Sequence, residues 1–124
     1  MTNKRLLIID DEERIRELVQ ACLEDLGGWD TVTAASGEEG LKIALKEPVD
    51  AILLDLSMPD MDGLTVYKQL QANSITQLIP VIILTAKVLP SERSRFVKTG
   101  IAGIISKPFQ PLTICQEIAK ILGW

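Results

Sequence analysis

Five short apolar runs, separated by longer amphipathic segments, constrain the fold of this chain more than any other feature of its sequence. The runs occupy residues 6–9, 31–35, 51–54, 81–84 and 103–105. Several are continuous rather than alternating, as in strands that are covered on both faces. Because parallel sheets carry helices on both faces, the pattern favours a parallel sheet.

The segments between these runs have the periodicity and boundary residues of helices. Residues 12–26 carry apolar side chains at spacings of three and four, and two glycines follow. Ser36 and Glu39 form a capping-box pattern before a second helix that ends ahead of Pro48. Three further helices are predicted at residues 64–70, 90–100 and 111–122, the last two opened by proline.

Strands and helices that alternate through short connections imply right-handed crossovers in one parallel sheet. We therefore predict an α/β fold, a three-layer α/β/α sandwich around a five-stranded parallel sheet. The 124 residues have the size of one domain, and we expect residues 1–124 to form it. Because the last predicted helix ends at residue 122, we expect no output domain in this chain.

The composition excludes several classes of function. The net charge of −4, from 13 basic and 17 acidic residues, argues against direct nucleic-acid binding. No apolar run approaches the roughly 18 residues of a membrane helix, and acids follow the N-terminus too early for a signal peptide. We expect a cytoplasmic protein without membrane contact. Cys22 and Cys115 stand alone in helical patterns, as reduced core residues do.

Polar residues stand where four of the predicted strands end. Asp10 and Asp11 follow the first strand, Asp55 the third, Thr85 the fourth and Lys107 the fifth. Ligands of open parallel sheets bind outside the carboxyl ends of the strands, so these five side chains are the natural candidates for a site. The chain contains no histidine, which removes the commonest general base and transition-metal ligand.

Three neighbouring carboxylates repel one another unless a cation lies between them. Oxygen ligands without His or Cys select Mg²⁺, Mn²⁺ or Ca²⁺ over zinc, and a small carboxylate set suits hydrated magnesium beside a phosphate. Lys107 then offers a charge to phosphate oxygens, and Thr85 a hydroxyl. Asp55 is a candidate nucleophile that forms an aspartyl phosphate. Pro59 and Gly63 are expected to shape the following loop through the backbone angles that they fix or tolerate.

The segments "IIDDE", "DLSMPDMDG", "ILTA" and "ISKPF" resemble, in order and spacing, the receiver domain of two-component response regulators. The resemblance covers essentially the whole chain. It implies a flavodoxin-like fold with strand order 2-1-3-4-5.

The resemblance also implies how the site acts. Asp55 is the phosphoacceptor, and the donor is a histidine kinase or a histidine phosphotransfer protein. Magnesium, with manganese as a substitute, is held by Asp10, Asp11, Asp55 and the backbone carbonyl of Ser57. Asp11 ligates directly and Asp10 through water. The signal passes to an unknown downstream protein, so the chain is a regulatory phosphoacceptor rather than an enzyme and assists only its own phosphorylation and dephosphorylation.

Further roles follow from the same resemblance. Thr85 is the switch hydroxyl, Lys107 contacts the phosphate, and a cis peptide precedes Pro108. The positions that tune the lifetime of the phosphoryl group are occupied by Ser57 and Lys87.

One position departs from the family pattern. Receivers carry Tyr or Phe three residues before the Lys, where this chain has Ile104. In the family the aromatic swings inward and links the site to the surface of the fourth helix, last strand and fifth helix. We expect a muted or differently routed surface change here.

Three alternatives remain open at this stage. The chain could be a receiver-like interaction module that signals without phosphate. It could instead be a haloacid-dehalogenase-like aspartate phosphatase, but such enzymes resemble the pattern Asp-x-Asp after the first strand, whereas Asp55 follows the third and Ser57 lies two residues on. Asp10 and Asp11, taken alone, could merely cap the first helix.

Overall fold

The computed structural model describes residues 4–56, 58, 61, 63–86, 91, 94, 96, 98–107 and 109–124. One sheet of five parallel strands has the order β2-β1-β3-β4-β5. The strands are β1 (Arg5–Ile9), β2 (Asp30–Ala34), β3 (Ala51–Asp55), β4 (Val81–Thr85) and β5 (Gly103–Ser106). The predicted fold class and strand order are confirmed.

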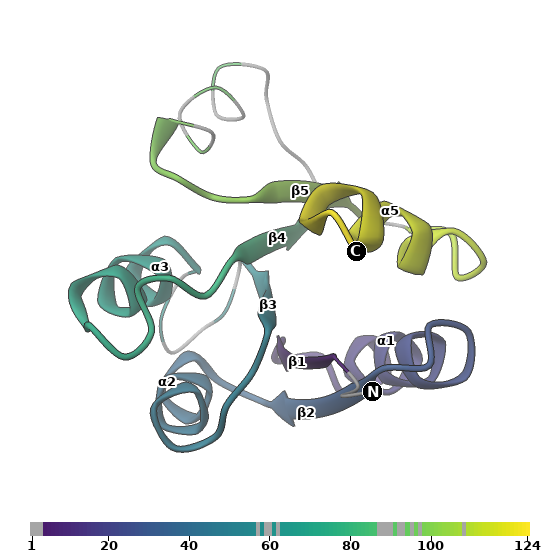
Figure 1. Ribbon diagram of the computed structural model, residues 1–124, viewed down its shortest axis with the longest axis horizontal. Helices are drawn as coiled ribbons and strands as arrows, with labels where there is room; N and C mark the ends of the chain where they lie inside the picture. The colour runs from purple at the N-terminus through teal and green to yellow at the C-terminus, as the bar shows by residue number, and fades with distance from the viewer. Residues whose placement is uncertain are drawn as a thin grey trace.

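Helices cover both faces of the sheet. They are α1 (Glu13–Asp25), α2 (Gly37–Lys46), α3 (Gly63–Ala72) and α5 (Ile114–Leu122). Viewed along the sheet, α2 and α3 lie on one face and α1 and α5 on the other (Figure 1). The arrangement is the three-layer sandwich that continuous apolar strands predict, because such strands bury side chains on both faces.

Two apolar cores result from the alternation of side chains along each strand. In β1, Leu7 and Ile9 join the core that includes Val66 and Leu70 of α3. The intervening Leu6 and Ile8 join the core on the other face, with Val19 and Leu23 of α1 and Ile114 and Ile118 of α5. All four residues of β1 named here have no exposed surface. The central strands therefore form a rigid platform for whatever follows them.

Most predicted boundaries lie within two residues of the observed ones, but the start of the last helix was wrong. Pro111 does not open α5, which begins at Ile114. The carbonyl of Gln110 accepts hydrogen bonds from the amides of Thr113 and Ile114, both at 3.0 Å. Pro111 therefore takes the second position of a turn, where its fixed φ is equally favourable.

The predicted fourth helix is described only in part. Its residues 91, 94, 96 and 98 are helical, and Gly100 follows with a φ of +99°, as a residue that ends a helix often has. Pro90, which the sequence assigns to its start, lies outside the described residues. Among the described helices, none is both long enough and apolar enough to span a membrane.

Candidate functional site

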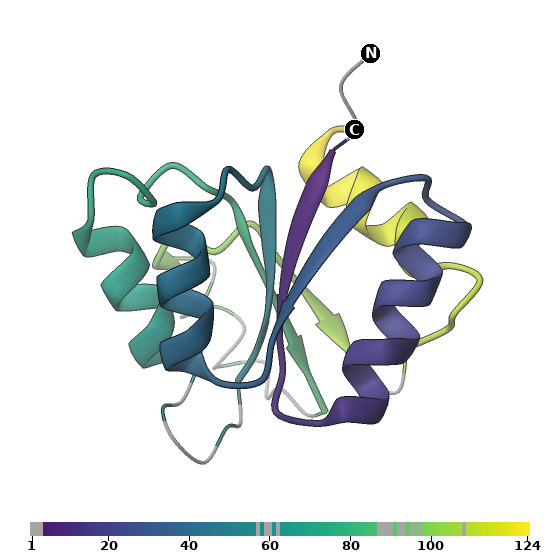
Figure 2. The same cartoon turned by 90° about the horizontal axis from the view of Figure 1, so that it is seen from below.

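The parallel strands end at the lower edge of the sheet in Figure 2, and the candidate side chains come together there. Ile9 of β1 pairs with Leu54 of β3, so the residues that come next, Asp10 and Asp55, are neighbours across the sheet. Asp55 in turn pairs with Leu84, the residue before Thr85. The register of the central strands thus brings distant parts of the sequence to one place.

Three carboxylates form the acidic part of the site. One oxygen from each of Asp10, Asp11 and Asp55 lies within 4.8 Å of the others. Asp10 is fully buried and Asp55 is 5% exposed, whereas Asp11 is exposed. Asp11 makes no hydrogen bond or ion pair in the described part of the chain. An all-oxygen donor set with one exposed carboxylate fits a hard divalent cation that keeps several waters.

Lys107 supplies the opposing charge. Its Nζ donates to Asp10 Oδ2 at 3.0 Å and to Asp55 Oδ1 at 3.4 Å, and it lies 3.9 Å from Glu12 Oε1. Burial by itself would lower the pKa of Lys107, but the hydrogen bond to Asp10 and the charges of Asp10, Asp55 and Glu12 together raise it above 10.5. The ammonium is therefore a fixed positive charge at neutral pH.

Asp10 also caps the first helix. Its Oδ1 accepts a hydrogen bond from the amide of Glu12 at 2.9 Å, immediately before α1. The side chain of Glu12, which occupies the N-cap position, makes no capping bond. The capping role and the site role are therefore not exclusive, because one carboxylate oxygen serves the helix while the other meets Lys107.

Two residues of the site were missed by sequence reasoning. Glu12 reaches the rim of the cluster through Lys107, and Arg16 donates from Nη1 to the backbone carbonyl of Asp10 at 2.7 Å. The sequence gives only a weak indication of these two residues. Glu12 and Arg16 lie four residues apart at the start of the helix that follows the acidic pair, and so on one face of that helix. Periodicity assigns such residues to a solvated surface unless the loop geometry is known.

Gly63 closes the loop that follows Asp55. Its amide donates to the carbonyl of Leu56 at 2.9 Å. A Cβ at this position would lie 2.6 Å from the carbonyl oxygen of Asp55 and 2.8 Å from the Cα of Leu56. Glycine is thus required because a larger residue would collide with the backbone of the candidate phosphoacceptor. The sequence suggests a different reason, namely the backbone angles that glycine tolerates.

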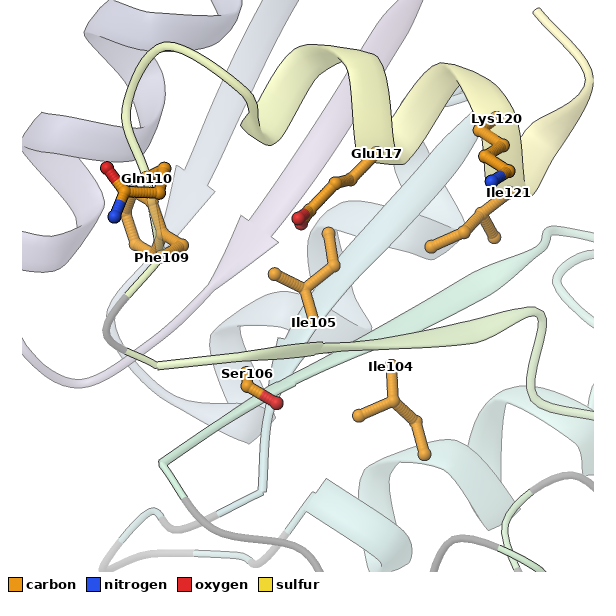
Figure 3. Close-up of a pocket in the computed structure, with 8 residues that line it drawn as sticks. All are labelled: Ile104, Ile105, Ser106, Phe109, Gln110, Glu117, Lys120 and Ile121. Carbon is orange, nitrogen blue, oxygen red and sulfur yellow. The ribbon is translucent and has the colours of Figure 1, made fainter.

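Thr85 and Ile104 occupy the neighbouring strands. Thr85 is 5% exposed, its carbonyl accepts from the amide of Lys107 at 2.6 Å, and its hydroxyl has no partner among the described residues. Ile104 is half-buried and packs against the core that contains α3. In β5, Ile104 and Ile105 point to opposite faces (Figure 3). Both line a cleft of about 380 Å³ beside α5.

Four of the predicted site residues fall outside the part of the chain that the structure describes. These residues are Ser57, Pro59, Lys87 and Pro108, so their assigned roles stay predictions.

Cys22 and Cys115 are both free thiols, as expected. Burial raises the pKa of each, and the Cys115 thiol donates to the carbonyl of Cys22 at 3.3 Å, which joins α5 to α1.

Comparison with known proteins identifies the family. The chain is 38% identical over 120 residues to the alkaline phosphatase synthesis transcriptional regulatory protein PhoP of Bacillus subtilis, covering 97% of this chain and 49% of that protein. It is 35% identical over 122 residues to the transcriptional regulatory protein SrrA of Staphylococcus aureus, covering 98% of this chain and 48% of SrrA. The chain thus spans about half the length of these curated relatives.

Solved structures of receiver domains and response regulators have the same fold as this chain. The chemotaxis response regulator CheY4 of Vibrio cholerae superposes with a TM-score of 0.90 at 31% identity, over 97% of this chain and 99% of CheY4. The receiver domain of the sensor histidine kinase PA1611 of Pseudomonas aeruginosa, which has a magnesium ion in its active-site cleft, shares the fold with a TM-score of 0.86 at 24% identity, over 99% and 100% of the two chains. A family model of the response regulator receiver domain matches residues 6–119, and the chain belongs to this family of two-component signalling modules.

Proposed function

We propose that Asp55 accepts a phosphoryl group from a phosphohistidine partner in a magnesium-dependent reaction, and that the chain relays the signal through protein contacts. The observation that carries the proposal is the convergence of Asp10, Asp11 and Asp55 with Lys107 at one edge of the sheet. The donor is a histidine kinase or a histidine phosphotransfer protein. The chain itself has no histidine, so the donor imidazole comes from a partner.

The reaction transfers a phosphoryl group from an imidazole nitrogen of the partner to a carboxylate oxygen of Asp55. A carboxylate oxygen of Asp55 forms a bond to phosphorus while the phosphorus–nitrogen bond breaks and its electron pair returns to the partner's imidazole. Lys107, 3.4 Å from Asp55 Oδ1, neutralises charge on the phosphoryl oxygens. The Thr85 hydroxyl donates to one of these oxygens once the group is in place. Most of the catalysis is positioning and charge neutralisation.

Asp10, Asp11 and Asp55, with the backbone carbonyl of Ser57, would hold the metal. Bound Mg²⁺ supplies further neutralisation of the phosphoryl charge, and Mn²⁺ accepts the same oxygen ligands. The exposed carboxylate of Asp11 is suited to direct ligation. Asp10 has both oxygens engaged, which suits contact with the ion through water.

The proposed role is regulatory rather than enzymatic, and its downstream target is an unidentified protein. The net charge of −4 does not favour direct contact with nucleic acid by this chain, whatever its longer relatives do as transcriptional regulators. Two free cysteines accord with a reducing compartment, so we assign the chain to the cytoplasm. With Ile104 in place of an aromatic, we expect phosphorylation to produce a muted or differently routed change of the surface around β5.

Intact mass spectrometry tests the proposal directly. The protein is incubated with MgCl₂ and acetyl phosphate or phosphoramidate, quenched in acid, and weighed. We expect one added phosphoryl group that requires magnesium and is absent from Asp55→Asn. The matched control is Asp25→Asn, which removes an exposed carboxylate at the end of α1 and should be phosphorylated like the wild type.

Two further measurements, a magnesium titration and an assay with an added phosphoester, separate the alternatives. Saturable magnesium binding without any adduct, also with a histidine kinase as donor, would favour an interaction module that signals without phosphate. Sustained turnover of an added phosphoester would instead indicate an aspartate phosphatase. A single adduct per chain without such turnover would support the regulatory phosphoacceptor.

A further inference from the structure

Arg16 contacts the acidic loop from a position that the proposed phosphotransfer does not use. It lies one turn into α1 and is partly buried. Its Nη1 donates to the backbone carbonyl of Asp10 at 2.7 Å, and its amide donates to the carbonyl of Glu12 at 3.0 Å. The side chain of Arg16 thus reaches from α1 back to the loop that connects β1 to α1.

The carbonyl that Arg16 holds belongs to the peptide group that joins Asp10 to Asp11. A peptide group is planar, so fixing its oxygen fixes the direction in which the chain enters Asp11. Asp10 has other anchors, since its amide donates to Ala34 and its carboxylate bonds to Glu12 and Lys107. Asp11 has no hydrogen bond or ion pair of its own among the described residues. Its orientation therefore depends on the backbone before it.

We propose that Arg16 is a positioning residue that holds the Asp10–Asp11 peptide so that the Asp11 carboxylate faces the metal. The inference rests on the proposed function, because it assigns Arg16 a part in building that same metal site. Groups that orient metal ligands from the outer shell typically change metal affinity 10- to 100-fold when they are removed.

The guanidinium has two effects of opposite sign on a bound cation. Its positive charge repels the cation, so its removal should tighten binding if charge alone matters. Its hydrogen bond preorders the loop, so its removal should weaken binding if position matters. Geometry favours the second effect, since the bond is short and goes to the peptide group of the only exposed ligand of the three carboxylates. The direction of the affinity change therefore distinguishes positioning from electrostatics.

The test is a titration with MgCl₂, followed by ¹⁵N–¹H NMR, of wild type, Arg16→Met and Arg14→Met. Methionine keeps the length of the apolar stem and removes the charge and the donors. Arg14 is the matched control, because it is exposed on the same turn of α1 and makes no hydrogen bond or ion pair in the described part of the chain. Circular dichroism first verifies that each variant is folded. If Arg16→Met is unfolded, Arg16→Gln replaces it, because its side chain is neutral and too short to reach the carbonyl.

We expect the dissociation constant for magnesium to rise about tenfold in Arg16→Met and to stay within about twofold of wild type in Arg14→Met. Arg16→Lys, which keeps a charge and a donor, should recover part of the affinity. A dissociation constant in Arg16→Met equal to or below that of the wild type would overturn the inference. Wild type without saturable magnesium shifts would instead contradict the metal site of the proposed function itself, so the two failures are distinguishable.

Discussion

At Asp10, a carboxylate with no exposed surface has a partner for every polar atom. The amide donates to Ala34, the carbonyl accepts from Arg16, and the two carboxylate oxygens accept from Glu12 and Lys107. A buried charge is tolerated only when it is paired and hydrogen-bonded. The loop after β1 is thus held by the same contacts that place its acids in the site.

The first prediction at this scale concerns Lys107. Lys107→Met leaves buried carboxylates without their counter-charge, and we expect the free energy of unfolding in metal-free buffer to fall by about 3 kcal/mol. Urea denaturation of both proteins measures the difference. Because the pKa of Lys107 is raised in the folded state, its stabilising effect is fully present below pH 10.5 and is lost as the pH rises through the folded value. A difference that disappears between pH 7 and pH 9 would contradict this account.

The second prediction concerns Gly63. A Cβ in Gly63→Ala meets the backbone of Asp55 and Leu56, which cannot move aside as a flexible side chain can. We expect a loss of about 1–3 kcal/mol in the free energy of unfolding and a slower phosphorylation of Asp55, because the strain falls on the reacting residue. Urea denaturation and the rate of adduct formation by mass spectrometry measure the two effects. Wild-type stability together with a wild-type rate would disprove the steric requirement.

At the scale of elements, the sequence predicts every strand to within one residue but misplaces the start of α5. Runs such as residues 51–54 are apolar on both faces, and burial on both faces leaves a continuous pattern that few other structures share. A proline, in contrast, is equally favourable in a first helical turn and in the second position of a β-turn, so Pro111 misplaces the start of α5.

The residues of the site likewise differ in how well the sequence predicts them. Asp10, Asp55, Thr85 and Lys107 follow from strand ends alone, since parallel strands end at one edge. The contact of Arg16 with the carbonyl of Asp10 depends on how the loop turns, which no periodicity encodes. Residues that end strands are thus predictable, and those that hold backbone groups between elements are not.

A prediction at the element scale concerns Tyr67, which ties α3 to the turn before β5. Its hydroxyl donates to the carbonyl of Thr99 at 2.9 Å, and the side chain is 4% exposed. Tyr67→Phe keeps the packing and leaves that carbonyl without its donor, so we expect unfolding to become easier by about 1 kcal/mol in urea. The control is Lys68→Ala, an exposed change on the same helix that should alter stability by less than about 0.5 kcal/mol. Equal effects of the two changes would show that the hydrogen bond does not hold these elements together.

For the whole molecule, the two cores and the site make opposite contributions to stability. The cores bury apolar side chains on both faces of the sheet, whereas the site holds Asp10, Asp11 and Asp55 together at its edge. Lys107 offsets only part of their repulsion, since three negative charges face one ammonium. Native metal-free protein therefore retains like-charge repulsion that the unfolded chain relieves.

A cation that binds only the folded state should reverse this effect. Such a ligand stabilises by RT ln(1 + [L]/Kd), so millimolar MgCl₂ should raise the melting temperature of the wild type in a dose-dependent way. Asp11→Ala removes the exposed ligand and part of the repulsion at once. We expect it to melt at a higher temperature than the wild type without metal and to respond less to magnesium. Thermal denaturation by circular dichroism, with NaCl matched for ionic strength, measures both differences, and equal magnesium shifts in the two proteins would rule out the metal assignment.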